Sequence, residues 1–404
     1  MNTPTCRICS HQTHWLVPHL QDKHSLSEAE YLAKYPGEIL VSDKVRHTVM
    51  PSTGRQHPPV KLMTKFAGFP VAVNSDVESD ACLMLPDHYR TPTSGQLAED
   101  VKAAAISLIK RRKTYIWGQA GAGKDAIIQA FSYYTQTPAK MFQIDPTVDI
   151  RPWFFSHEIV AGQGTVWHEG ELLRALRDGY KSPTTGRVIP YLILITDFDR
   201  ATKAQAESMR LVMDSIQGRV MGPNGVVYTV LPGTQIVVTA NSAGSGDSSG
   251  RYGSSNVIDA SIMDRFERCF QFHWMDWADE GKVVSDKFPL IAARAPWIFE
   301  RVGKCTESLR VAISTEQLFG EFSHRAVCAW LGHTQDMIEF LDPSAAVPSG
   351  ILSLSFRAYE DKLSDTEARQ TARRLIDPLL AGGAVNQGST SHVGSPAPAG
   401  GRLR

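Results

Sequence analysis

The stretch Gly118-Gln119-Ala120-Gly121-Ala122-Gly123-Lys124-Asp125 decides the fold of this chain. It follows a predicted strand over 114–117 and opens a predicted helix over 126–134, the context that makes a G-x4-G-K pattern specific for phosphate. Glycines let backbone N–H groups turn toward a phosphate, the start of the helix adds a favourable dipole, and Lys124 can reach the β- and γ-phosphate oxygens. The sequence therefore predicts that this loop and the following Ala126 bind the phosphates of a nucleotide.

Strand and helix patterns alternate on both sides of this glycine-rich loop. Predicted helices cover 97–110, 126–134, 171–179 and 204–216, and predicted strands cover 114–117, 139–144, 191–196 and 234–241. Such alternation predicts an α/β fold, with a parallel sheet covered by helices on both faces. Residues 280–380 lose the strand signals, and we expect them to form a C-terminal helical lid.

Composition argues against three classes of protein: a broadly charged nucleic-acid binder, a secreted disulfide-rich protein and a membrane protein. The 404 residues hold 42 Lys and Arg against 42 Asp and Glu, so net charge gives no whole-chain argument for a nucleic-acid binder. Of six cysteines only Cys6 and Cys9 are close in sequence, which is unlike a secreted disulfide framework and favours a reducing cytoplasm. No apolar run approaches the ~18 residues of a membrane span, and MNTPTCRICS lacks a basic-then-apolar signal pattern. We therefore expect a soluble, cytoplasmic protein without a membrane partner.

The metal half of the predicted site departs from the usual pattern at two positions. The residue after the lysine is normally Ser or Thr, whose hydroxyl coordinates Mg²⁺, but here it is Asp125. The predicted apolar strand over 191–196 ends in Thr196-Asp197. In one register Thr196 stands where a metal-binding carboxylate is usual and Asp197 where the catalytic acid is usual. The loop then has a carboxylate in place of its usual hydroxyl, and the strand has a hydroxyl in place of its usual carboxylate. In this register Asp125, Thr196 and Asp197 surround one Mg²⁺.

A second register of the same strand stays open. It makes Asp197 the metal-site carboxylate, places Phe198 where the catalytic acid should stand and leaves Asp125 unexplained. In either register an Asp125 carboxylate without a cation would repel a triphosphate. The sequence thus predicts either Mg²⁺ at Asp125 or weak nucleotide binding.

Further motifs follow in a fixed order. Asn241 ends the predicted strand over 234–241, and then come G-S-G-D-S-S-G-R-Y over 244–252 and M-D-R-F over 263–266. With the glycine-rich loop and the acidic strand, this order resembles the AAA+ subunit of aerobic cobaltochelatase and the wider MoxR-type group of AAA+ ATPases, over residues 95–335. The resemblance implies an AAA+ fold that binds ATP and Mg²⁺ and hydrolyses ATP.

The resemblance also implies roles for particular residues. Asp197 and Asn241 would be catalytic, with Asn241 orienting the attacking water, and Arg265 would be an arginine finger supplied to a neighbouring subunit. Arg325, in F-S-H-R over 322–325, would contact nucleotide from the helical lid. A finger that acts on a neighbour requires a ring, for which we expect a hexamer. The alternatives are ordinary roles, namely a strand-end cap for Asn241 and solvated surface positions for Arg265 and Arg325.

Several functions fit this resemblance. The first is a ring ATPase that remodels or activates a protein partner, which by resemblance carries a metal-ion-dependent von Willebrand A-like domain. The alternatives are the motor subunit of a metal chelatase, a DNA-acting AAA+ protein, and an ATP-assembled scaffold that does not hydrolyse ATP.

The N-terminal segment has its own metal pattern. Cys6-x2-Cys9-x9-His19-x4-His24 supplies two thiolates and two imidazoles, enough for one tetrahedral Zn²⁺ site. His11 and His14 are spare imidazoles. The segment resembles small bacterial and phage-type zinc fingers, but residues 1–60 are nearly neutral, so docking to protein fits as well as contact with DNA.

These signals divide the chain into five parts. We expect a zinc-finger-like domain over 1–40, an irregular linker over 41–94, the nucleotide-binding α/β domain over 95–279, the helical lid over 280–380 and a disordered Gly/Ser/Pro-rich tail over 381–404. An insertion with Trp153, Phe154, Phe155, Gly162, Gly164 and Trp167 precedes the helix over 171–179. Its aromatic residues fit either the core or a surface that faces a partner.

Overall fold

The computed structural model describes residues 4–13, 16–36, 38, 40, 63–161, 164–210, 212–214, 218–223, 225–246, 255–363 and 365–381. The chain divides into two compact units, Met1–Val60 and Lys61–Arg404. Parts of the sequence predictions fall outside the described residues: His14, Gly162, positions 247–252 of the G-S-G-D loop, linker positions 41–62 and tail positions 382–404.

Among its described residues, the first unit has the helices α1 (Leu16–His24) and α2 (Glu28–Lys34) on a very small core. A capping box starts α2: Glu30 N–H donates to Ser27 Oγ at 3.3 Å, and Ser27 N–H donates to the Glu30 carboxylate at 2.8 Å. In the described part of this unit, the buried apolar cluster consists of Cys6, Leu16, Leu20, Tyr31 and Leu40. So small a core seldom stabilises a domain alone, which is the usual reason for a structural metal.

A parallel sheet organises the second unit. Its spatial strand order is β13-β3-β12-β9-β4, and every neighbouring pair is parallel. The strands are β3 (Thr114–Gly118), β4 (Ala139–Gln143), β9 (Leu192–Thr196), β12 (Gln235–Ala240) and β13 (Arg268–Phe272). The predicted α/β fold is confirmed. Because the strands are parallel, their carboxyl ends meet at one edge of the sheet, where the glycine-rich loop also begins.

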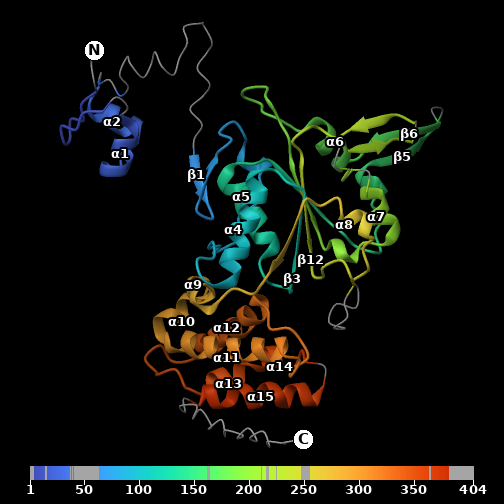
Figure 1. Ribbon diagram of the computed structural model, residues 1–404. Coiled ribbons are helices and arrows are strands. Elements are labelled where there is room, and N and C mark those ends of the chain that lie inside the picture. The colour runs from blue at the N-terminus through green and yellow to red at the C-terminus, as the bar shows by residue number, and fades with distance from the viewer. Residues whose placement is uncertain are drawn as a thin grey trace, which may run out of the picture. The chain divides into compact units, whose positions relative to one another are not determined.

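Helices cover both faces of this sheet (Figure 1). On one side lie α4 (Gly95–Ile109) and α5 (Lys124–Thr135), and on the other lie α6 (Glu171–Asp178), α7 (Lys203–Arg210) and α8 (Ala260–Met263). Strand side chains alternate between the two cores. Leu192 and Leu194 pack in the cluster that contains α4 and α5, and Ile193 and Ile195 pack in the opposite cluster.

Short hairpins and turns of 3-10 helix connect or extend the main elements of the second unit. The antiparallel pairs are β1 (Met63–Phe66) with β2 (Phe69–Ala72), β5 (Phe155–Val160) with β6 (Gly164–Glu169), β7 (Tyr180–Lys181) with β8 (Val188–Ile189), and β10 (Arg219–Met221) with β11 (Val227–Thr229). The 3-10 turns are η1 (Ser79–Ala81), η2 (Arg151–Trp153) and η3 (Phe198–Arg200). In the insertion Phe154 is buried, whereas Trp167 on β6 is 50% exposed.

The structure differs from the predicted elements in several places. Strand β13 of the sheet is not among the predicted strands. The β1–β2 hairpin occupies part of the stretch expected to be irregular, and it turns at Ala67 and Gly68, which both have positive φ. Helix α7 ends at Arg210, before the predicted end of that helix at 216. The carbonyl oxygens of Met213 and Asp214, beyond this end, accept hydrogen bonds from Lys113 Nζ.

A helical region follows the sheet. Its helices are α9 (Trp277–Lys287), α10 (Pro289–Arg294), α11 (Trp297–Ser314), α12 (His324–Glu339), α13 (Ile351–Ser355), α14 (Arg357–Glu360) and α15 (Thr366–Leu380). They enclose a separate core in which Phe322, Trp330 and Phe356 are fully buried. Among the helices that the structure describes, none is both long and apolar enough to cross a membrane.

Candidate nucleotide and metal sites

The glycine-rich loop leads from β3 into α5 and has a backbone that needs its glycines. Gly118, Gly121 and Gly123 have φ of +152°, +71° and +81°. A Cβ on Gly118 would lie 2.2 Å from the carbonyl oxygen of Phe272, and a Cβ on Gly121 would lie 2.7 Å from the Cβ of Ser323. Positive φ and close approach thus both exclude side chains at positions 118 and 121.

Lys124 is the first residue of α5 and is only 9% exposed. Its Nζ donates to the carbonyl oxygens of Gly118 at 2.7 Å and Gln119 at 3.0 Å, and to Asn241 Oδ1 at 3.1 Å. Burial lowers the pKa of Lys124, and the nearby carboxylates, Asp125 first among them, oppose that shift. Two predicted site residues from separate motifs, Lys124 and Asn241, are therefore in contact.

Asp125 has a partner that sequence reasoning missed. Its Oδ1 accepts a hydrogen bond from Thr239 Oγ1 at 2.6 Å. Thr239 lies on β12, two residues before Asn241. Burial raises the pKa of Asp125, while the hydrogen bond from Thr239 and the charge of Lys124 act in the opposite direction. Nothing in the sequence shows that β12 is the neighbour of β3, so this pairing could not be read from it.

The acidic pair lies at the end of β9. Thr196 is buried, and Asp197 follows with a left-handed φ of +56°. Asp197 Oδ2 accepts a hydrogen bond at 2.9 Å from the side-chain amide of Gln143, which lies opposite Thr196 on β4. The charge of Asp197 influences the pKa values of both Lys124 and Asp125. Asp197 therefore lies near the glycine-rich loop, as both registers considered for the sequence require.

Asp199 is a second carboxylate that the sequence did not single out. It is fully buried, and its Oδ2 accepts a hydrogen bond from Ser255 Oγ at 2.5 Å. Its carbonyl oxygen accepts the backbone N–H of Asn256 at 2.6 Å. Asp199 thereby joins the segment after β9 to the segment that leads into α8 and Arg265.

The two predicted arginines lie at opposite ends of the fold. Arg325 is exposed in the first turn of α12, and its charge opposes the effect of burial on the pKa of Asp125, so it lies in the neighbourhood of α5. Arg265 precedes β13, whose first residue, Arg268, pairs with Thr114 at the start of β3. The strand β3 places about 13 Å between that end and the loop. Arg265 is therefore remote from the site of its own chain.

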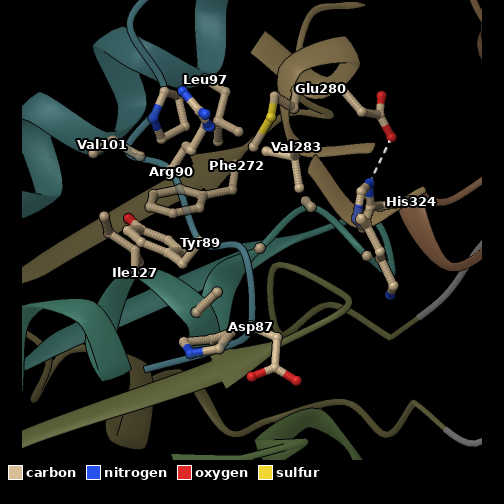
Figure 2. Close-up of a pocket in the computed structure, with 18 of the residues that line it drawn as sticks. Asp87, Tyr89, Arg90, Leu97, Val101, Ile127, Phe272, Glu280, Val283 and His324 are labelled. Carbon is tan, nitrogen blue, oxygen red and sulfur yellow. Dashed lines mark hydrogen bonds and ion pairs between the residues drawn. The ribbon is translucent and has the colours of Figure 1, made fainter. Parts of the chain in front are cut away.

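A cavity of about 380 Å³ opens beside the loop. Figure 2 shows Tyr89, Ile127 and Phe272 together on one wall, with Glu280 and His324 on the opposite side. The aromatic and aliphatic wall suits a flat, apolar group, and the adjoining loop suits phosphate. The arrangement fits a nucleotide with its base in the cavity and its phosphates at Lys124.

Residues 114–266 match the family model "AAA domain (dynein-related subfamily)". These residues form an AAA domain. Among solved structures, three variants of Thermotoga maritima RuvB are similar at 12% identity, with TM-scores of 0.43, 0.40 and 0.41. The similarity covers 69%, 68% and 69% of this chain and 73%, 69% and 72% of theirs. No curated protein matches the chain.

Side chains from the helical region and from the segment before α9 hold both backbone groups of Ala120, a residue of the glycine-rich loop. Ala120 N–H donates to Glu321 Oε1 at 3.1 Å, and the Trp274 indole N–H donates to the Ala120 carbonyl oxygen at 3.2 Å. The Arg310 guanidinium lies over the Trp274 ring at 5.1 Å. Through these contacts the position of the helical region is linked to the conformation of the phosphate-binding loop.

A buried ion cluster joins three helices of the helical region beside the loop. The fully buried Glu280 of α9 accepts hydrogen bonds from Arg310 at 2.6 and 3.0 Å. It also pairs with His324 Nδ1 at 2.9 Å (Figure 2). Burial alone would lower the pKa of His324, but its hydrogen bonds with Cys328 and Glu280 raise the pKa to about 9. His324 is thus a cation at neutral pH and adds positive charge to the cavity wall, next to Arg325.

The N-terminal unit brings its four predicted zinc ligands together. The ligand atoms of Cys6, Cys9, His19 and His24 all lie within 4.8 Å of one another. His19 Nε2 and His24 Nε2 are 3.1 and 3.3 Å from Cys9 Sγ. The His11 ring stacks on His19, with 4.4 Å between ring centroids, but is not one of the four. Two thiolates and two imidazoles at this separation fit one tetrahedral Zn²⁺ ion.

Proposed function

We propose that the chain is a ring-forming ATPase that binds and hydrolyses Mg-ATP at the carboxyl edge of its sheet. The observation that carries this proposal is the contact of Lys124 with Asn241, because it joins the phosphate-binding loop to the polar end of β12. The carboxylates of Asp125 and Asp197 are both near enough to Lys124 to oppose the effect of burial on its pKa. This set can bind phosphate, hold a hard cation and position a water molecule.

Each residue then has a role in the reaction. The amides of residues 118–126 and the Lys124 ammonium bind the phosphates, and Arg325 approaches them from the helical region. Asp197 accepts the proton of the attacking water, and Asn241 orients that water. Bound Mg²⁺ supplies neutralising charge to the triphosphate. Arg265 serves the site of the next subunit, which its remote place in its own chain favours.

The magnesium site in this proposal is an exchanged one. After the loop lysine, where a hydroxyl is usual, Asp125 supplies a carboxylate. At the end of β9, where a carboxylate is usual, Thr196 supplies a hydroxyl. Asp197 follows Thr196 as the third residue of the site. The donors suit the ion, because Mg²⁺ prefers carboxylate and hydroxyl oxygens. Mg²⁺ at this place also offsets the repulsion between Asp125 and a triphosphate.

The exchange predicts a rescue. Asp125→Thr alone should reduce Mg²⁺-dependent ATP hydrolysis by about 10- to 100-fold, since a ligand charge is lost. Combining it with Thr196→Asp should restore most of that loss, because the usual hydroxyl and carboxylate pair is then rebuilt. Steady-state phosphate release over a Mg²⁺ titration measures both, with Thr196→Asp alone as the control. A double variant no better than Asp125→Thr would rule out the exchange.

The partner of the proposed ring is a protein. The MoxR-type resemblance favours remodelling or activation of a partner with a von Willebrand A-like domain, in a hexamer. The near-neutral charge of the N-terminal unit favours protein docking over contact with DNA for the zinc finger. All six cysteines are free, in keeping with a location in the cytoplasm.

Zinc in the N-terminal unit is part of the proposal and has its own test. The purified chain should carry one zinc ion, and chelation should unfold residues 1–40 while ATP hydrolysis by the AAA domain continues. Zinc content and helical signal by circular dichroism measure this result. Cys9→Ser should lose the metal, whereas the matched His11→Ala should keep it. Full zinc content in Cys9→Ser would contradict the assigned ligands.

A further inference from the structure

We propose that Thr239 is a positioning residue of the magnesium site, where its hydroxyl fixes the Asp125 carboxylate for the metal. This inference rests on the proposed ATPase function. The direct observation is the hydrogen bond of 2.6 Å from Thr239 Oγ1 to Asp125 Oδ1. Thr239 itself is only 2% exposed, so its hydroxyl is held inside the fold.

The place of Thr239 in the sheet explains why it reaches Asp125. Side chains along a strand alternate between faces, so Thr239 lies on the same face as Val237, which packs in the core with α5. Asn241 follows two residues later. These two residues contact the first two residues of α5: Asn241 meets Lys124, and Thr239 meets Asp125. The end of β12 therefore sets the positions of both the cation and the carboxylate that begin α5.

The hydrogen bond from Thr239 can orient the Asp125 carboxylate as well as hold α5 against the sheet. A carboxylate on a short side chain can rotate, and a donor on one oxygen fixes the plane in which its lone pairs are offered to a cation. Residues that orient a metal ligand in this way change metal affinity without touching the metal. A threonine whose only task was to hold α5 on the sheet would instead affect nucleotide binding with and without metal alike.

The test compares three variants of the full chain. Thr239→Val keeps the shape and removes the hydroxyl, Thr239→Ser keeps the hydroxyl, and Thr306→Val removes a buried hydroxyl that bonds only within α11. We expect Thr239→Val to need about 10-fold more Mg²⁺ for half-maximal ATP hydrolysis. Its affinity for ATP in EDTA should stay within about twofold of wild type. Thr239→Ser and Thr306→Val should resemble wild type in both measurements.

Each other outcome decides against the inference. Wild-type Mg²⁺ dependence in Thr239→Val, no rescue by Thr239→Ser, or an equal loss of ATP affinity in EDTA overturns the positioning role and leaves the ATPase proposal intact. A wild-type protein that neither binds nor hydrolyses Mg-ATP overturns the proposed function and this inference together. If Thr239→Val fails to fold, as judged by thermal melting, Thr239→Ala is compared with Thr239→Ser in its place.

Discussion

Lys124→Ala is expected to abolish detectable ATP hydrolysis and to weaken ATP binding by at least about 100-fold, because charge-assisted hydrogen bonds to phosphate are lost. Lys124 is the buried cation of the loop, and its present acceptors are two loop carbonyls and Asn241. A phosphate that enters the loop brings stronger, charged acceptors to the same ammonium group. The effect should therefore appear in binding as well as in turnover.

Calorimetric titration with Mg-ATP and steady-state phosphate release check this expectation. Lys102→Ala is the matched control, because Lys102 is an exposed lysine of α4 that pairs with Glu99. Thermal melting shows whether the loss of Lys124 alters the fold. A Lys124→Ala protein that binds ATP as tightly as the Lys102→Ala control would show that the loop does not bind the phosphates.

Arg265→Ala should reduce turnover by about 1,000-fold or more in the assembled ring, the scale of an arginine finger, and leave ATP binding unchanged. The reason is geometric. Arg265 lies at the amino end of the sheet, beside the start of β3, and the loop of its own chain is at the other end. In the proposed ring, Arg265 would serve the site of a neighbouring subunit.

Mixing two inactive proteins tests this trans arrangement. Arg265→Ala keeps an intact loop, and Lys124→Ala keeps an intact finger, so interfaces that combine the two are complete. An equal mixture should recover about a quarter of wild-type turnover if subunits assemble at random. Arg268 is an exposed arginine on β13, so Arg268→Ala is the control and should stay active. A mixture without recovered turnover would contradict the finger assignment.

The sequence predicted four of the five sheet strands, all but β13, and the glycine-rich loop, because their signals are local. Buried strands such as Leu192–Thr196 are short apolar runs, and the loop needs glycine where φ is positive and where other chain segments come close. The four zinc ligands were also predicted from local spacing, and the structure places them within reach of one ion.

The missed features depend on which segments become neighbours in space. Thr239 contacts Asp125 because β12 lies beside β3, and Glu280 holds Arg310 and His324 because α9, α11 and α12 pack together. No periodicity along the chain reports such pairs. The β1–β2 hairpin did carry a local signal, namely Gly68 at its turn, but the surrounding prolines favoured irregular structure instead.

The most direct measurement is steady-state ATP hydrolysis by the wild-type chain and Asp197→Asn, at saturating Mg²⁺. Asp145→Asn serves as control, because Asp145 is an exposed carboxylate that caps its own turn at Thr147. We predict turnover by wild type and control, and a fall of at least about 100-fold in kcat for Asp197→Asn with unchanged ATP affinity, the scale of a lost general base. Wild-type protein that binds Mg-ATP without turnover, or Asp197→Asn that turns over like wild type, would contradict the proposed ATPase.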